Sequence, residues 1–447
     1  MFCVQPSGCV VCCCSNACRK QNRLRVVGIC LELSICVLSF VSTFDRANIA
    51  IQHILIMSNV NHTDLEAALD KYVKTYLEKV SVDNAQQVIS EFNEKWKTIV
   101  GYKATTLDSQ SKYGLALVSL SIAYYELPES SEKDISHLSR LVDEYDDDTN
   151  TKRTLYGLEI NQSLHYNIGS CWHKLGVLYD AKALESFKKS IYYSFSLSYC
   201  MSRPITAYRF KKCSEHLYQS LINEQLNISS PTTFNDPFDS PLLELLESDS
   251  SDINRLLYQA YKECLKVACF TDNIKQPYQL NSNLPEIRNE KKRANCKEEF
   301  LNSLMWAHYA DSHKGICIKY RFDNFVTKVG CTDKNVVAYF YDIEYYDGDV
   351  EKIKKDDRTI SFKKAFFYKG KQWEYENELR FLYYDVNGKG DYATIDVPDS
   401  IEAIYFGLKC SEKDEKAIRK IMKDKNVQFY KMQMDEKHFG QLKAVKI

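Results

Sequence analysis

A predicted strand ends in a rigid turn at Ser229-Ser230-Pro231-Thr232-Thr233-Phe234-Asn235-Asp236-Pro237-Phe238-Asp239. Asn and Asp side chains bond nearby backbone amides and therefore favour turns. Pro237 also restricts Asp236 to an extended conformation. Such a turn either serves only the fold or presents Asn235 and Asp236 to a ligand. The residues alone leave both interpretations open.

Two later segments are also crowded with aromatic, carboxylate and imidazole groups. They are Met305-Trp306-Ala307-His308-Tyr309-Ala310-Asp311-Ser312-His313-Lys314-Gly315 and Trp373-Glu374-Tyr375-Glu376-Asn377-Glu378-Leu379-Arg380. In the first of them, His308 and His313 are five residues apart, so on a continuous helix they would point in different directions. This spacing is not that of a His-x-x-x-His zinc pair, and we predict no metal there.

The second segment carries the strongest chemical signal. Its alternation from Tyr375 to Phe381 predicts a strand in which Glu374, Glu376 and Glu378 lie on one face. Three like charges on one face repel one another, so the strand needs basic partners. Candidates close in sequence are Lys369, Lys371 and Arg380. Because burial or pairing shifts carboxylate pKa values, as in many catalytic sites, we predict that Glu376 and Glu378 are catalytic.

The whole chain divides into a helical part and a mixed part. Residues 57–203 are predicted to be α-helical, and Tyr166 to Ile191 resembles a degenerate tetratricopeptide helix pair in which Gly169 lets two helices approach while Trp172 and Phe187 fill the seam. Residues 204–447 are predicted to form an α+β domain with a mainly antiparallel sheet. Its strand candidates are 206–210, 226–229, 267–271, 316–320, 336–346, 379–384, 393–397, 403–406 and 427–432, and its helix candidates are 214–223, 241–267 and 411–425.

The N-terminal residues 1–56 have a different composition. They hold eight of the 17 cysteines, but no second cysteine pair follows at a zinc-site interval. Within residues 24–41, an apolar run from Val26 to Val41 follows a basic stretch, yet this run is shorter than a membrane span and contains Glu32. We interpret 1–56 as a non-native or disordered leader that precedes a start at Met57; a membrane anchor and a folded cysteine module are the alternatives.

The composition and the distribution of cysteines are those of a globular protein of a reducing compartment, and we predict a cytoplasmic location. Basic and acidic residues number 59 and 60, which gives a net charge of −1, so no general attraction to nucleic acid is expected. A membrane would be a partner only if residues 24–41 were an anchor. The remaining cysteines are scattered singly, which suits buried thiols.

Over residues 205–410, the three crowded segments resemble a largely bacterial protein family known as domain of unknown function 2971. The resemblance implies that the three segments form one functional region, but it implies no reaction. It favours Asn235 and Asp236 as ligand-binding residues, and Trp306 and Tyr309 beside a catalytic His308.

A second resemblance is to ADP-ribosyltransferases. In that family an Arg or His on a first strand binds NAD, and a late acidic residue stabilises the oxocarbenium-like ribose as nicotinamide leaves. Carried over by position, Arg209 beside Tyr208 would bind NAD, and Glu378 would be the catalytic carboxylate with Glu376 beside it. The chain departs from the family pattern because the middle strand has no Ser-Thr-Ser, only Cys269-Phe270-Thr271 or Ser229-Ser230.

Two other classes of function remain open. A metal-dependent phosphodiesterase would gather hard oxygen ligands around Mg²⁺ or Mn²⁺. Its candidate residues are Asp236, Asp239, His308, Asp311, Glu376 and Glu378. A non-catalytic adaptor would dock a protein partner on the helices and bind a nucleotide or peptide on the sheet domain. The predicted ligand-binding residues are Tyr208, Arg209, Asn235, Asp236, Trp306, Tyr309, Lys369 and Arg380.

Overall fold

The computed structural model describes residues 64–96, 107–146, 155–196, 205–234, 239, 252–271, 301–322, 335–346 and 368–447. The interpretations of residues 1–56, including the segment 24–41, and of Asn235 and Asp236 lie outside these residues. None of the helices in these ranges is long and apolar enough to cross a membrane.

The chain divides into two compact units, one of helices and one built on a sheet. The described helices of the first are α3 (Asp64–Tyr76), α4 (Ala85–Trp96), α5 (Leu107–Glu126), α6 (Glu132–Asp146), α7 (Leu155–Lys174), α8 (Asp180–Ser196) and most of α11 (Asp252–Cys264), with a 3₁₀ turn, η2 (Val177–Tyr179). The predicted boundary at residues 203 and 204 falls between α8 and the first strand. The fold class is therefore α+β, as predicted.

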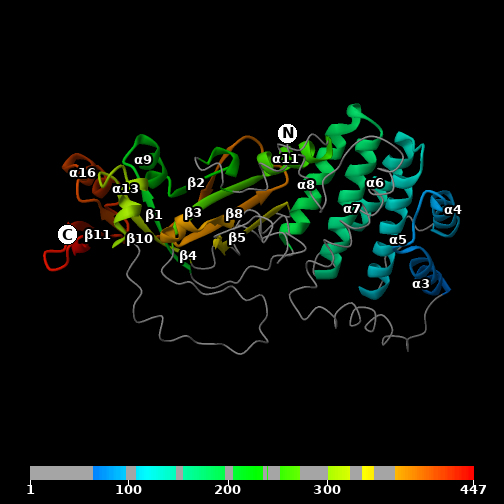
Figure 1. Cartoon of the computed structure of the whole chain (residues 1–447), viewed down its shortest axis with the longest axis horizontal. Helices are drawn as coiled ribbons and strands as arrows, with labels where there is room; N and C mark the ends of the chain where they lie inside the picture. Colours follow the sequence, from blue (N-terminus) through cyan, green and yellow to red (C-terminus); the bar gives the residue numbers. More distant parts are fainter. Residues whose placement is uncertain are drawn as a thin grey trace, which may run out of the picture. The chain divides into compact units, whose positions relative to one another are not determined.

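Helices α7 and α8 pack tightly against each other along their length (Figure 1). The close approach depends on Gly169, because a Cβ there would lie 2.8 Å from Cε1 of Phe187. Phe187 is buried, and so is Trp172, whose ring stacks on Tyr179 with centroids 5.6 Å apart. The predicted seam is confirmed in these contacts, whereas the tetratricopeptide resemblance stays a prediction.

The second unit is built on a ten-stranded, mainly antiparallel sheet. Its strands are β1 (Ile205–Lys211), β2 (Gln225–Ser229), β3 (Leu265–Thr271), β4 (Ile316–Phe322), β5 (Val336–Asp342), β8 (Glu378–Asp385), β9 (Tyr392–Asp396), β10 (Ile401–Phe406), β11 (Gln428–Met434) and β12 (Leu442–Lys446). The order is β12-β11-β10-β4-β1-β3-β2-β9, with β8 joined to β3 and β5. A separate parallel pair is formed by β6 (Glu344–Tyr346) and β7 (Tyr368–Gly370).

Short helical elements complete the chain. They are α9 (Glu215–Ile222), η3 (Pro231–Thr233), α11 (Asp252–Cys264), α13 (Ser303–Tyr309), η6 (Lys371–Glu376) and α16 (Glu412–Ile421). The predicted helices at 214–223 and 411–425 are confirmed, and each begins where a serine side chain, Ser214 or Ser411, caps the first turn. The predicted strand 336–346 is wrong as one element, since it breaks at Ile343 into β5 and β6.

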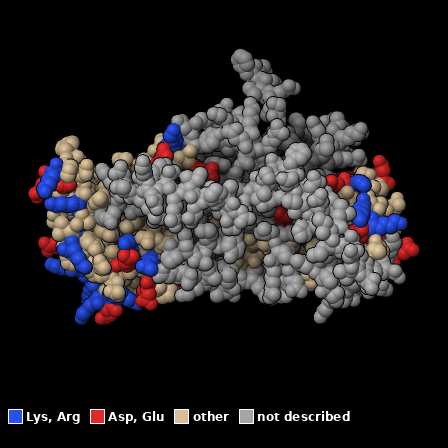
Figure 2. Space-filling view, turned by 90° about the horizontal axis from the view of Figure 1, so that it is seen from below, with Lys and Arg blue, Asp and Glu red and all other residues tan. Residues whose placement is uncertain are grey.

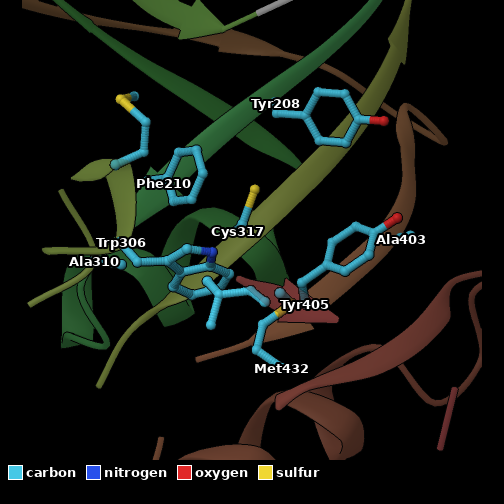
Figure 3. Packing of buried hydrophobic residues seen from close by; sticks show 10 residues of the cluster. Tyr208, Phe210, Trp306, Ala310, Cys317, Ala403, Tyr405 and Met432 are labelled. Carbon is cyan, nitrogen blue, oxygen red and sulfur yellow. The ribbon is translucent and has the colours of Figure 1, made fainter. Parts of the chain in front are cut away.

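The two faces of the sheet differ in what they bury. Directly paired residues point to the same face, so Tyr208, Thr271 and Glu378 share one face through their pairings on β1, β3 and β8. This face also carries a core cluster around Trp306 of α13, whose ring meets Phe210 edge-on at 5.2 Å (Figure 3). We call it the charged face, for the residues described below.

The opposite face, called the aromatic face, carries Phe270 on β3, Phe340 on β5 and Phe381 on β8. The Phe270 and Phe340 rings are 6.0 Å apart, and those of Phe340 and Phe381 are 5.0 Å apart. Over the described surface visible in Figure 2, basic and acidic side chains alternate without a large patch of either sign, in keeping with the net charge of −1.

Candidate functional site

The three crowded segments meet at β8. Arg380 lies under the ring of Phe234, with 5.4 Å from its guanidinium carbon to the ring centre, and its Nη2 donates to Asp239 Oδ2 at 2.7 Å. These two residues flank Asn235 and Asp236 in sequence. From α13, the Tyr309 hydroxyl donates to Glu376 Oε1 at 2.5 Å. The structure thus brings described residues of all three segments into one cluster.

The cluster is a buried network of charges. Lys369 Nζ lies 2.6 Å from Glu376 Oε2 and 3.1 Å from Glu378 Oε2, so one lysine bridges two carboxylates. Arg380 Nε donates to Glu378 Oε1 at 2.6 Å. Glu376, Glu378 and Arg380 are only 3%, 4% and 0% exposed. With Asp239 the network holds three acids and two bases, and pairing is what makes such burial tolerable.

A turn at Asn377 creates the carboxylate pair. Residues up to Glu376 form the 3₁₀ element η6, and Asn377 adopts a left-handed conformation with φ of 41°, which Asn tolerates better than most residues. The prediction of a strand from Tyr375 with three glutamates on one face is therefore wrong. Glu374 lies in η6 and is exposed, whereas Glu376 and Glu378 turn inward to Lys369.

The two carboxylates have pKa values displaced in opposite directions. Burial raises the pKa of Glu376 above its usual range, and the attraction of Lys369 offsets only part of that rise. Burial acts on Glu378 too, but Arg380 and Lys369 outweigh it and lower the pKa of that carboxyl to about 2. Glu378 is therefore the ionised member of the pair, and Glu376 is the one whose protonation changes more readily.

Two further groups, which the sequence did not single out for this site, complete its lining. The Tyr345 hydroxyl accepts the Glu378 backbone N–H at 2.7 Å, and the Cys269 side chain hydrogen bonds to the Glu378 carboxylate. The pairing of Cys269 with Arg380 across β3 and β8 places this thiol on the charged face. Only the strand register could have revealed it.

Three other predicted residues, His308, Trp306 and Tyr208, lie outside the ion network. His308 is exposed on α13, with its ring 6.3 Å from that of Tyr375. Trp306 and Tyr208 are 0% and 3% exposed, and both belong to the core cluster of the charged face (Figure 3). Both side chains therefore pack in the core, and their role in ligand binding stays a prediction.

Arg209 is not part of the cluster. It is the neighbour of Tyr208 on β1, so it points to the other face of the sheet, and its guanidinium carbon lies 5.5 Å from the centre of the Phe270 ring on the aromatic face. The predicted pocket shared by Arg209 and Glu378 is therefore wrong. The alternation of a strand separates them, and the register that decides their faces was not visible in the sequence.

Arg209 and Lys211 form a second charged feature, on the aromatic face. Arg209 donates to the Asn227 carbonyl at 3.1 Å, and no carboxylate of the described residues forms an ion pair with either side chain. The charge of Arg209, together with burial, lowers the pKa of Lys211 to about 7. Two neighbouring cations without a carboxylate favour the approach of an anion.

A metal site does not fit the residues on the charged face. Within the described ranges, no group of three His, Cys, Asp or Glu side chains is arranged to hold a metal ion. The carboxylates of Asp239, Glu376 and Glu378 face Lys369 and Arg380, and these cations occupy the side on which an ion would be coordinated.

Residues 305–381 match the model of a family described as "Protein of unknown function (DUF2971)". The matched range spans α13 to β8, and so includes Tyr309, Lys369, Glu376, Glu378 and Arg380. The family resemblance inferred from the sequence is confirmed over this range. No curated protein and no solved structure matches the chain.

Proposed function

We propose that the buried cluster on the charged face is the active site of an NAD-using, ADP-ribosyltransferase-like enzyme. One observation carries the proposal: Glu376 and Glu378, bridged by Lys369, have pKa values moved apart. Adjacent carboxyl groups with divergent pKa values are the usual basis for dividing two roles between two acids.

Each carboxylate has a role that its surroundings favour. Glu378, held ionised by Arg380 and Lys369, would stabilise the positive charge that develops on the ribose as nicotinamide departs. Glu376, with its raised pKa, would take the proton of the acceptor nucleophile, because a base works best when its pKa approaches the working pH. Lys369 and Arg380 hold the two carboxylates in place.

A substrate must also be able to reach the two carboxylates. Both carboxylates are almost unexposed, and the Tyr309 hydroxyl occupies Glu376 Oε1. Tyr309 and Trp373, whose ring lies 5.1 Å from Lys369 Nζ, are only half-buried. Substrate would therefore enter past these two rings, with Tyr309 released from Glu376. Arg209 has no part in this site, because it lies on the other face.

The test is release of nicotinamide from NAD in the presence of a cell lysate as the source of acceptors. Glu378→Gln keeps the size of the side chain and removes its charge, so release should fall by about 10²-fold or more. The matched control is Glu402→Gln, which removes a carboxylate from a partly exposed ion pair with Lys319 and should keep full activity. Wild-type protein that is folded yet releases no nicotinamide would overturn the proposal.

A second candidate function, nucleotide binding without turnover, is favoured by the Arg209 and Lys211 pair. The Arg209 guanidinium beside the Phe270 ring, with Lys211 two residues further along the strand, suits an anionic group attached to an aromatic base. Calorimetry with ADP-ribose would then show binding that weakens at least tenfold in Arg209→Met, while Glu378→Gln binds as the wild type does. The opposite pattern would favour the charged face.

A further inference from the structure

Two cysteines far apart in sequence meet at one end of the sheet. Cys213 follows β1, and Cys410 follows β10. These strands flank β4, and Lys211 and Phe406 are both paired with Ile316 at its first residue. The chain beyond each pairing therefore leaves the sheet at the same edge, where the Cys213 Sγ donates to the Lys314 carbonyl and the Lys409 N–H, next to Cys410, donates to the His313 carbonyl.

The surroundings of the two thiols differ. Cys410 immediately precedes Ser411, the N-cap of α16, and its carbonyl accepts a hydrogen bond from Lys431 Nζ at 3.2 Å. The interaction with Cys213 and the charge of Lys431 lower the pKa of the Cys410 thiol, against the effect of burial. The same interaction raises the pKa of Cys213. Cys410 is accordingly the better nucleophile, with Cys213 as the protonated neighbour.

The pair is only partly shielded from solvent and lies apart from the charged cluster. Cys213 is half-buried, Cys410 is 7% exposed, and both are free thiols. Cys264 and Cys317 are also free thiols, but they are only 1% and 0% exposed. A nucleophilic thiol that a small oxidant can reach, with a second thiol beside it, is the arrangement of peroxide-sensitive cysteine pairs.

We propose that Cys213 and Cys410 are an oxidation site that forms a reversible disulfide with hydrogen peroxide. The Cys410 thiolate attacks one peroxide oxygen and becomes a sulfenic acid, and the other oxygen leaves as water after protonation. The Cys213 sulfur then attacks the Cys410 sulfur, an S–S bond forms, and a second water leaves. Two thiols are oxidised and one peroxide is reduced, and a dithiol reverses the reaction.

The disulfide would covalently join the loops that follow β1 and β10, close to α13. The Cys213 Sγ donates to the Lys314 carbonyl at 3.9 Å, and the Lys409 N–H donates to the His313 carbonyl at 3.0 Å. Both loops that the cross-link joins therefore already hold the segment after α13, the helix that carries Tyr309. A bridge that closes so long a loop restricts the unfolded chain, so the midpoint of thermal unfolding of the oxidised protein should rise.

Peptide mapping of the full-length protein tests the proposal. The reduced protein is treated with hydrogen peroxide, digested without reductant and searched for a peptide pair joined through Cys213 and Cys410. We expect this pair to appear, and to disappear with dithiothreitol. Cys213→Ser should instead accumulate a sulfenic acid at Cys410 that dimedone traps, and Cys410→Ser should give neither product.

Two results would overturn the proposal. One is the absence of the joined pair under conditions that oxidise a low-pKa reference thiol. The other is a joined pair that uses a different partner for either cysteine. A double variant with serine at both positions, compared with the wild type by thermal unfolding under reducing conditions, shows whether the substitutions themselves disturb the fold.

Discussion

At the scale of single residues, the stability of the buried charged cluster depends on Arg380. It is fully buried and pairs with both Glu378 and Asp239. Removing one partner of a buried network leaves the remaining charges without compensation, which costs more than the network contributes when intact. We therefore expect Arg380→Met to lower the free energy of unfolding by about 3 to 5 kcal/mol.

Urea unfolding measures this change, and Lys319→Met is its control. Lys319 pairs with Glu402 on the same sheet at 2.7 Å, but both side chains are partly exposed. Such a pair contributes at most about 1 kcal/mol. Equal losses in the two variants would contradict the view that burial makes the Arg380 pairs critical.

The lowered pKa of Glu378 gives a dependence of stability on pH. Because its pKa is lower in the folded state, ionised Glu378 contributes stability that is complete above the usual carboxyl value of 4.5 and is lost as the pH falls toward about 2. Glu378→Gln lacks this contribution. The difference in free energy of unfolding between wild type and variant should therefore shrink between pH 5 and pH 3. Urea titrations at several pH values measure it, and a difference that stays constant with pH would show that the pKa of Glu378 is not lowered.

At the scale of elements, Gly169 sets the distance between α7 and α8. Alanine there would overlap the Phe187 ring, although alanine is the better helix former. Overpacking costs about 1 to 3 kcal/mol and outweighs the gain in helix propensity. We expect Gly169→Ala to destabilise the helical unit, with partial recovery in the double variant Gly169→Ala, Phe187→Leu, which removes the ring. If thermal unfolding shows no recovery in the double variant, the contact with Phe187 is not the cause of the destabilisation.

The elements also show where sequence reasoning succeeded and failed. The strands at β3, β4 and β8 were predictable because their apolar runs are short and bounded, and the seam at Gly169 because a small residue faced a large one. The family resemblance implied that the three crowded segments form one region. The repulsion among the glutamates of residues 374–378 implied a basic partner, and Lys369 pairs with Glu376 and Glu378.

What failed depended on long-range geometry. The alternation at residues 373–378 suggested a strand, yet Asn377 takes the left-handed turn that ends η6. The faces of Arg209 and Glu378 follow from the pairing of β1 and β8 with β3, which joins residues distant in sequence. The meeting of Cys213 and Cys410 likewise requires the strand order β10-β4-β1, which no local pattern encodes.

At the scale of the whole molecule, each unit has a core of its own. Leu117, Leu164 and Phe187 are among the buried residues of the helical unit, and Phe381 and Trp306 among those of the sheet unit. Units with separate cores open locally with different free energies. A variant in one core should therefore loosen the backbone of that unit and leave the other unchanged.

Hydrogen exchange read out by peptide tests this independence with the two variants already described. Gly169→Ala should speed exchange in α7 and α8 but not in β3 and β8, because its overlap lies with Phe187. Arg380→Met should do the reverse, speeding exchange in β3, β5 and β8, to which its pairings belong. If either variant sped exchange in both sets of peptides, the two cores would unfold as one cooperative body. The ion network around Glu378 would then have to be counted in the stability of the helices as well as in that of the sheet.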